Sequence, residues 1–338
     1  MDLDERRLAE LMTAIDPAVT PVDDSLTPER AALLRRIKSE RGATPHLAPL
    51  SSRTRRWRRA SIVSTVIATM VLIGIALIPA ITGTSRAEAC TPASLDFSGP
   101  TPTVSEVLRM TNDKLSTPSD VMTAQRSASY TGWYLQVDNR PDQKSQVAIS
   151  PQITNLTWFA DRSGRLVVTA GKPYWADGNS GPVSSSHAPT PGTVLSDVTF
   201  RAGQFDVPST EVPGATETDL HETLTALGMP EDADSFTMIE SVRRLLTLWT
   251  LDNRQEAALL HILLHSDNVT VNGTATDRAG RRVIGISADS SDRAGLRNTL
   301  LISTKTARIV GIETTRTTSH GNVPPGAVVA YTLWKDTN

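Results

Sequence analysis

Residues 269–304, "VTVNGTATDRAGRRVIGISADSSDRAGLRNTLLIST", decide the fold class of this chain. Three segments rich in β-branched residues, 269–276, 281–288 and 297–304, alternate with the tetrapeptide "DRAG". Asp at the first and Gly at the fourth position of a tetrapeptide suit a type I turn followed by a bulge. Neither tetrapeptide carries the further acidic side chains that a calcium-binding loop needs. We therefore predict antiparallel hairpins.

Further strands are predicted on both sides of this stretch. Downstream, residues 308–316 and 327–334 have the same β-branched composition. Upstream, a third tetrapeptide of this kind, Asp161-Arg162-Ser163-Gly164, separates two predicted strands. The upstream strands are predicted at 130–138, 152–160 and 165–175. Because hairpins join antiparallel strands, the sheet is predicted to be a meander and not a parallel, helix-crossed sheet.

Helical patterns precede and divide these strands. Residues 103–116, "TVSEVLRMTNDKLS", have apolar positions at helical spacing. Between the two sets of strands, helices are predicted at 216–228, 235–250 and 253–266. Residues 103–336 are therefore predicted to form one α+β domain, in which an antiparallel sheet carries a helical insertion.

A membrane anchor is predicted upstream of this domain. Residues 60–85 contain no ionisable side chain, and about 20 apolar helical residues suffice to cross a bilayer. Arginines lie almost entirely on the N-terminal side of the run, so the positive-inside rule places the N-terminus in the cytoplasm and residues 86–338 outside the cell membrane. These arginines are Arg53, Arg55, Arg56, Arg58 and Arg59. We predict a single-pass protein in contact with the lipid bilayer, with residues 53–85 as flank and span and 86–102 as a linker.

The apolar run also has features of a cleaved signal peptide and of a lipoprotein leader. Ala87-x-Ala89 fits a signal-peptidase site, and Cys90 directly after it suggests lipidation. The charged leader of 59 residues and the long apolar run favour an uncleaved anchor over both. Cys90 is the only cysteine, so no intrachain disulfide is expected.

Residues 1–52 are predicted to form a cytoplasmic stub of two short amphipathic helices and a linker. Such helices cannot bury much surface alone, so the stub is either a docking module for a cytoplasmic protein or a solvated tail. If it docks, the partner-binding residues are predicted to be Leu8, Leu11, Leu33 and Leu34.

Charge and motif content exclude several function classes. Residues 86–338 carry 22 Lys/Arg against 27 Asp/Glu, a net of −5, so no direct nucleic-acid binding is expected. His261 and His265 lie four apart, but Ile262 stands where a zincin has Glu. They are predicted to be surface or half-buried histidines. We predict no catalytic residue, no metal site and no cofactor.

Aromatic residues on the upstream strands are the candidates for ligand binding: Trp133, Trp158, Tyr174 and Trp175. Alternation along a strand sends neighbouring side chains to opposite faces, so one face can present aromatics to an acyl chain. Core packing is the alternative, and it is favoured because a sheet of this size needs such bulk.

The chain resembles a family of actinobacterial single-pass membrane proteins of unknown function. The resemblance rests on the leucine-containing stub, the arginine-flanked span, "LDNRQEAALLHILL" (251–264), "VTVNGTATDRAGRRVIGI" (269–286) and "LLISTKTARIVGIE" (300–313). It implies an anti-sigma-like companion of an extracytoplasmic-function sigma factor. It also implies an outer domain similar to the LolA/RseB fold, a helix cradled by an open antiparallel half-barrel. The stub lacks the His-xxx-Cys-xx-Cys pattern of zinc-type anti-sigma factors.

Two functions follow as hypotheses. The first is a non-enzymatic, envelope-sensing or anti-sigma-like regulator whose outer domain binds an apolar ligand or lipoprotein. The alternative is a membrane-tethered lipid or lipoprotein carrier with no signalling role.

Overall fold

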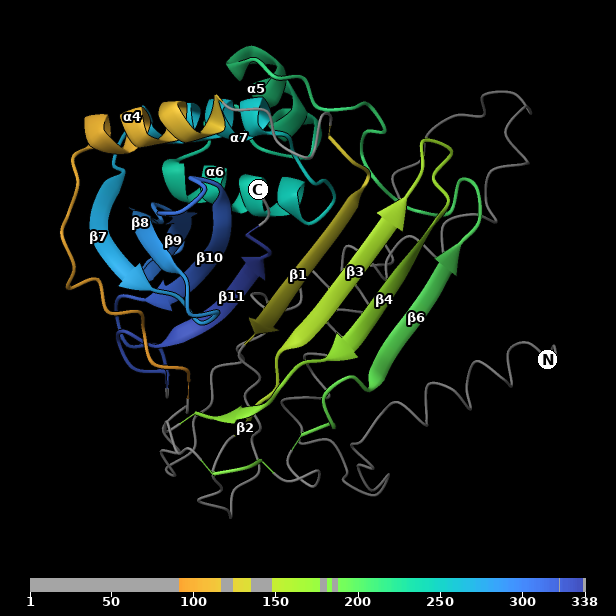
Figure 1. Ribbon diagram of the computed structural model, residues 1–338, viewed down its shortest axis with the longest axis horizontal. Helices are drawn as coiled ribbons and strands as arrows, with labels where there is room; N and C mark the ends of the chain where they lie inside the picture. The colour runs from red at the N-terminus through yellow and green to blue at the C-terminus, as the bar shows by residue number, and fades with distance from the viewer. Residues whose placement is uncertain are drawn as a thin grey trace, which may run out of the picture. The chain divides into compact units, whose positions relative to one another are not determined.

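The described part of the chain is an α+β domain built on one large antiparallel sheet (Figure 1). The structure is a computed structural model, and it describes residues 91–116, 124–134, 148–176, 181–183, 188–321 and 323–336. The sheet has nine strands in the order β6-β4-β3-β1-β11-β10-β9-β8-β7, and a separate two-stranded sheet pairs β2 with β5. Two meanders, one from each part of the sequence, are joined where β1 pairs with β11.

The C-terminal meander follows the sequence prediction closely. Its strands are β7 (Thr270–Thr276), β8 (Arg282–Asp289), β9 (Leu296–Ser303), β10 (Ile309–Arg316) and β11 (Val328–Trp334). Gly280 and Gly295 have φ of 76° and 80°, a conformation that only glycine adopts without strain. At the first "DRAG", Gly280 N donates to the Asp277 carbonyl oxygen, so the predicted turn is confirmed. At the second, Leu296 N donates to the Arg293 carbonyl oxygen, so Gly295 is the third residue of its turn; the hairpin was right and the turn position was wrong.

The third tetrapeptide forms a hairpin of a different kind. Here Arg162 has the positive φ of 60°, while Gly164 is the first residue of β4. A glycine is needed at position 164 because the chain there lies close to β3: a Cβ would lie 2.6 Å from the carbonyl oxygen of Thr157. The predicted bulge position was therefore wrong, although the hairpin was right.

The N-terminal meander differs from the prediction in two places. Its strands are β1 (Ser127–Tyr134), β3 (Gln152–Trp158), β4 (Gly164–Ala170) and β6 (Val194–Phe200), with β2 (Ala148–Ile149) and β5 (Tyr174–Trp175) in the small sheet. The predicted strand 165–175 splits after Gly171, whose N–H still bonds in register to the Pro151 carbonyl oxygen, because Pro173 has no N–H for the ladder. Strand β6 was not predicted.

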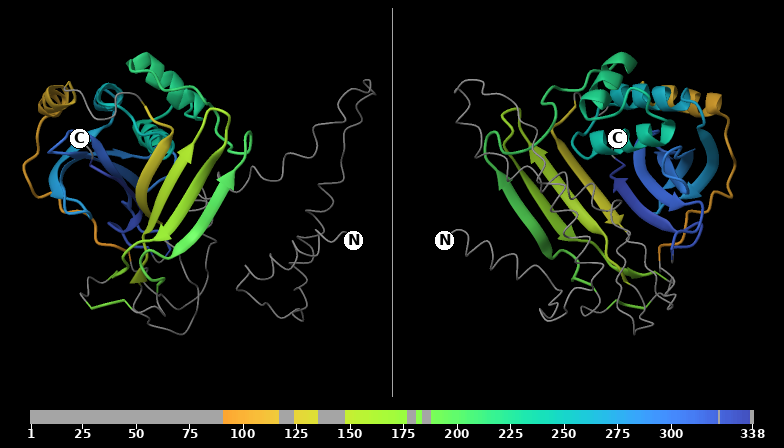
Figure 2. Two further views of the ribbon diagram at one scale, coloured as in Figure 1. Left: turned by 45° about the vertical axis from the view of Figure 1, so that its right-hand side comes forward. Right: turned by 180° about the vertical axis from the view of Figure 1, so that it is seen from behind.

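Four helices lie on one face of the sheet. They are α4 (Val104–Leu115), α5 (Glu217–Ala226), α6 (Ser235–Leu246) and α7 (Asn253–Leu264). Helix α6 packs on β8 and β9, and both α4 and α5 pack on α7. Figures 1 and 2 show strands β7–β11 curving around α6, while β1, β3, β4 and β6 extend away from the helices. The helical insertion was predicted with nearly these boundaries.

The face under the helices, here called the inner face, holds the main core. Leucines of α6 and α7 pack against inward residues of β8–β10, including Ile286, Leu300 and Ile312. The core also contains a buried ion pair. Arg308 donates from Nε to a Glu256 oxygen at 2.9 Å, and Ile309 N donates to the other oxygen at 2.8 Å.

A second, smaller core covers the opposite, outer face. It includes Val283, Leu301 and Val310. Residues 91–101, here called the N-terminal strap, cross this face with Leu95 and Phe97 packed on the core. The predicted linker 86–102 thus differs from the structure in its later part, because these two apolar side chains find a surface on the sheet.

Candidate functional site

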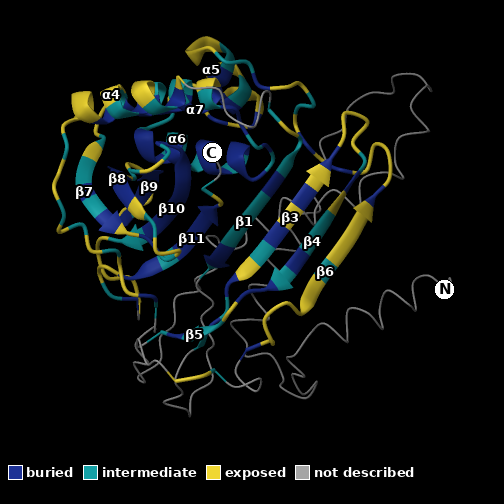
Figure 3. Cartoon of the chain, viewed as in Figure 1, coloured by how far each residue is buried: buried dark blue, intermediate teal, exposed yellow. Residues whose placement is uncertain are grey.

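Exposed apolar side chains gather on the N-terminal meander and the loop after it. Among the described residues, the large exposed hydrophobic residues are Val104, Phe159, Val194, Leu195, Val198 and Val212. All of these except Val104 fall between residues 159 and 212. Figure 3 shows the same asymmetry, with β6 exposed along most of its length and β8–β10 buried. A patch of apolar residues at the surface is a signal of binding, whereas single ones are ordinary.

A pocket opens at one end of this region, where β1 begins and β3 ends. Its volume is about 480 Å³. We call it the Arg126 pocket; it is lined by Gln125, Arg126, Ser127, Thr157, Trp158, Phe159 and Ala160. The β1–β3 pairing brings the two walls together, since Trp158 N donates to the Arg126 carbonyl oxygen at 2.9 Å. Phe159 at the rim is 57% exposed.

Aromatic rings fix the orientation of the walls. The indole Nε1 of Trp158 donates to the Leu248 carbonyl oxygen at 2.8 Å, which holds the ring against the turn after α6. Trp249 meets it edge to face with ring centroids 5.0 Å apart. Both rings are buried, so one side of the pocket is a rigid aromatic wall.

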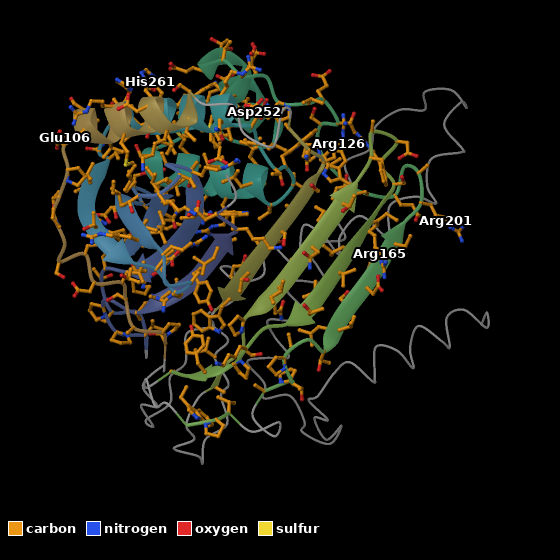
Figure 4. All side chains as sticks on the ribbon, viewed as in Figure 1. Glu106, Arg126, Arg165, Arg201, Asp252 and His261 are labelled. Carbon is orange, nitrogen blue, oxygen red and sulfur yellow. The ribbon has the colours of Figure 1, made fainter. Side chains whose placement is uncertain are left out.

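Arg126 supplies the charge of the pocket (Figure 4). Its guanidinium carbon lies 5.5 Å from the Trp158 ring centroid and 5.1 Å from that of Trp249, within the range of cation–π attraction. Nη2 donates to the Thr210 carbonyl oxygen at 2.6 Å. The buried Nε–H has no acceptor among the described residues. A donor without an acceptor costs free energy, so an incoming oxygen would be stabilised here.

The four predicted aromatic residues do not form one site. Trp158 is on the inner face and borders the Arg126 pocket. Trp133 is on the outer face, stacked on Tyr331 with centroids 6.0 Å apart. Tyr174 and Trp175 belong to β5, and the Tyr174 hydroxyl lies 3.4 Å from that of Tyr331. Trp133, Trp158 and Trp175 are all buried, which agrees with the core-packing alternative.

The outer-face aromatics surround a second ion pair. Arg278 donates from Nε to Glu313 Oε1 at 2.7 Å, and its guanidinium carbon lies 5.1 Å from the Tyr331 ring centroid. Burial raises the pKa of Glu313, although Arg278 opposes the shift. Arg278 also donates to the Ala93 carbonyl oxygen at 2.7 Å, so this cluster fastens the strap to the sheet.

A larger, polar cleft of about 780 Å³ lies where α6 begins beside β7–β9. Asp234, the N-cap of α6, accepts from Thr237 N at 2.8 Å and from Ser291 N at 2.9 Å. Burial alone would raise the pKa of Asp234, but the hydrogen bonds from Ser291 and Thr237 outweigh it and lower the pKa to about 2. Asp289 is likewise held by Arg297 at 2.7 Å. Asp289 and Arg297 are thus paired with each other, and Asp234 is held by neutral donors.

The rings of His261 and His265, the two histidines predicted at helical spacing, are in contact and tilted relative to each other. Their ring centroids are 4.1 Å apart. His265 Nδ1 lies 2.8 Å from the His261 carbonyl oxygen, and His261 Nδ1 lies 2.7 Å from Glu217 Oε1. Within the described ranges, no group of three His, Cys, Asp or Glu side chains is placed to hold a metal ion.

Several predicted features lie outside the described residues: the span 60–85, the arginines Arg53 to Arg59, the stub residues Leu8, Leu11, Leu33 and Leu34, and Cys90. Of the helices in the described part of the chain, none combines the length and apolarity needed to cross a bilayer. No family model matches the chain, and no curated protein matches it in sequence.

Sequence reasoning missed Arg126 and Phe159. Arg126 gains its role from Trp249, which is far away in sequence and reaches it only through the packing of the turn after α6 against β3. Phe159 sits in a predicted strand, where alternation alone does not tell an exposed ring from a buried one. The available signal was the cluster "TWFA" beside a turn, with two aromatic residues in succession.

Proposed function

We propose that the chain is a non-enzymatic, single-pass membrane protein whose outer domain binds an apolar envelope ligand at the Arg126 pocket. The observation that carries the proposal is the exposed ring of Phe159 at a pocket that is also lined by Trp158 and the cation of Arg126. The curvature of β7–β11 around α6, with β6 and β7 at separate edges of the sheet, supports an open half-barrel of the LolA/RseB plan.

The pocket favours an acidic amphiphile over a purely apolar compound. The exposed ring of Phe159 offers apolar surface, which an acyl chain can cover. The Nε–H of Arg126 lacks an acceptor, and a carboxylate or phosphate oxygen is the acceptor that a guanidinium binds most strongly. Free fatty acids and anionic phospholipids in a membrane share this chemistry.

Quenching of tryptophan fluorescence by a dibrominated fatty acid tests the pocket. We expect quenching of the full chain held in amphipol, and we expect it to decrease in Trp158→Phe, because Trp158 borders the pocket. Arg126→Met should weaken binding about tenfold, since a charge-assisted hydrogen bond is lost.

Matched controls come from the same molecule. Arg165→Met removes another arginine of the N-terminal meander, and Val104→Ser removes an exposed apolar residue on α4. Both should bind as the wild type does. Equal affinity in Arg126→Met and Arg165→Met would remove the Arg126 pocket as the site.

The membrane part of the proposal rests on the sequence. Residues 60–85 would anchor the chain with the arginine flank in the cytoplasm, which places Cys90 outside. A membrane-impermeant maleimide should label this single cysteine in intact cells. Labelling only after lysis would reverse the proposed topology.

In the regulatory part of the proposal, the stub binds an extracytoplasmic-function sigma factor. The full chain should co-purify with such a factor, and Leu8→Asp with Leu11→Asp should abolish this by placing charge on the apolar face. If the wild type holds no such factor while the fatty acid still binds, the chain is better described as a tethered lipid or lipoprotein carrier.

A further inference from the structure

The two edge strands of the nine-stranded sheet, β7 and β6, differ in whether a described segment lies alongside them. At the β7 edge, the N-terminal strap lies alongside, with Gly99 N donating to the Thr274 carbonyl oxygen at 3.2 Å. At the other edge, no strand within the described residues pairs with the outer side of β6. The side chains of β6 are exposed except at Ser196 and Phe200, and Figure 3 shows this exposure. Among the described residues, only one edge of the sheet is therefore covered by another segment.

The register identifies the backbone groups that face outward from β6. Alternate residues of an antiparallel strand direct their N–H and C=O groups to opposite sides. Phe159 N bonds to Ser163 O, so the odd residues of β4 face β3; Ala170 N bonds to Thr193 O, so the even residues face β6. Val168 pairs with Ser196, and Leu166 pairs with Val198. Leu195 lies in the bulge between Ser196 and Val194, so the alternation holds from Ser196 onward. The backbone groups of Asp197 and Thr199 consequently point to the free edge.

From Ser196 onward this edge lacks the devices that normally keep edge strands from pairing. Such devices are lysines, prolines, bulges, unpaired inward charges or a covering segment. The bulge of β6 lies at its start, where Val194 pairs with Thr169 and Ser196 with Val168. Strand β6 contains no Lys or Pro, and its single charged residue, Asp197, is an exposed acid that Arg165 contacts through two bonds of 2.8 and 2.6 Å. Val194, Leu195 and Val198 are exposed beside it. A seven-residue strand of this kind is a template for another strand.

We propose that the β6 edge binds an extended segment of another polypeptide, which adds to the sheet as a further antiparallel strand. Only a peptide backbone supplies alternating donors and acceptors at the spacing of Asp197 and Thr199. Apolar residues of the segment would lie next to Val194 and Val198, and a basic residue would suit the position opposite Asp197. This inference does not depend on the Arg126 pocket and would stand if no lipid bound there.

A second copy of the chain is a poorer occupant than a foreign peptide. A symmetric antiparallel pair of β6 strands, centred on the middle residue of 194–200, places Asp197 directly opposite its own copy. Like charges directly opposite each other destabilise a strand pair. Dimerisation through this edge is therefore an outcome that the test must detect.

The test uses the full chain in amphipol and a fluorescein-labelled peptide, acetyl-VTVKVTV-amide, which places its lysine opposite Asp197 and its valines beside Val194 and Val198. Thr199→Pro removes an outward N–H without removing a bond to β4, and proline is tolerated at sheet edges in this orientation. Thr199→Val keeps the N–H and the side-chain shape. A peptide with proline at its second position, acetyl-VPVKVTV-amide, keeps the lysine and provides a control that leaves the protein unchanged.

We expect saturable anisotropy with the first peptide and about tenfold weaker binding by Thr199→Pro, with Thr199→Val within about twofold of the wild type. The proline peptide should bind weakly to the wild type. Hydrogen exchange should slow at Asp197 and Thr199 and stay unchanged at Ser196 and Val198, which already face β4.

Three results would overturn the proposal. The first is no binding of acetyl-VTVKVTV-amide up to about 1 mM. The second is equal binding of both peptides by the wild type, or protection of all β6 amides alike. The third is a dimer that Thr199→Pro converts to a monomer, which would make a second copy the occupant.

Discussion

The two halves of the sheet share a meander topology but differ in what covers them. Strands β9 and β10 of the C-terminal half are buried at nearly every position, whereas β6 of the N-terminal half is exposed at most. The helices inserted between β6 and β7 fold back on the later half, and the strap and small sheet cover its outer face. The domain therefore separates a stable half from a half whose surface is available for binding.

The ion pairs of the two halves show the same division. The side chains of Arg308 and Glu256 are 5% and 4% exposed, while those of Arg165 and Asp197 are 62% and 41% exposed. A buried pair depends on both partners, because either one alone is an uncompensated charge. An exposed pair contributes little, because water and salt screen it.

The largest expected effect comes from breaking the buried pair. Arg308→Met should lower the free energy of unfolding by about 3–5 kcal/mol, because it leaves the Glu256 carboxylate buried alone. Urea unfolding of the full chain in amphipol, followed by near-ultraviolet circular dichroism, measures the loss. Arg165→Met is the matched change in the other half and should cost less than about 0.5 kcal/mol.

The pH dependence of the Arg308→Met variant gives an independent check. Burial raises the pKa of Glu256 above its ordinary value of 4.5 even with Arg308 present. A carboxyl whose pKa is raised on folding destabilises the fold at high pH and ceases to do so below its unfolded pKa. The loss in Arg308→Met should therefore shrink as the pH falls toward 4.5. A loss independent of pH would mean that Glu256 is not buried as described.

The next largest effect concerns the strap that covers the outer face. A Cβ at Gly285 would overlap the ring of Phe97. Gly285→Ala should thus displace the strap and cost about 2 kcal/mol in urea unfolding. Phe97→Ala should cost a similar amount through lost packing. The double variant should lose about 1 kcal/mol less than the sum, since the overlap is gone; strict additivity would show that the two residues do not touch.

Local signals in the sequence predicted much of the covered half and little of the exposed one. Turn residues and β-branched runs located β7 to β11, and capping residues such as Asp252 marked the helices. Strand β6 was missed because both of its faces are exposed, so "VLSDVTF" has no clear alternation of apolar and polar residues. The predicted strand 165–175 breaks at Pro173, because proline has no N–H to donate to a neighbouring strand.

The candidate site was harder to predict than the fold. Trp158 was identified, but the residues that make its surroundings a pocket come from three separate segments. Arg126 precedes β1, Phe159 follows β3 and Trp249 follows α6. No short motif contains them, and their proximity is a consequence of strand order and helix packing. Pattern reading finds single elements, whereas a site between elements needs the tertiary structure.

A smaller effect is expected at the helix that covers the later half. Asp234 caps α6 and also binds the loop after β8 through Ser291. Asp234→Ala should cost about 1 kcal/mol. Despite its partial burial, hydrogen bonds from Ser291 and Thr237 lower the pKa of Asp234 to about 2. A carboxyl of lowered pKa stabilises the fold above its unfolded pKa, and this stabilisation should disappear as the pH falls from 3.8 to about 2.

Asp234→Asn is the matched control for that titration, because an amide can cap the helix but does not titrate. Urea unfolding of the wild type and Asp234→Asn at several pH values between 2 and 5 should show converging stabilities at the acid end. If the two proteins keep a constant difference over this range, Asp234 does not carry the lowered pKa.

The smallest expected effect is also the most direct test of the comparison. Val198 on β6 and Val310 on β10 are the same residue type on opposite halves; Val198 is 39% exposed and Val310 is fully buried. Val198→Ala should change the free energy of unfolding by less than about 0.5 kcal/mol, whereas Val310→Ala should lower it by about 2 kcal/mol. Urea unfolding of both variants measures the two changes side by side. A cost at Val198 equal to that at Val310 would mean that β6 is covered in solution, and the division into a stable half and a binding half would then have to be given up.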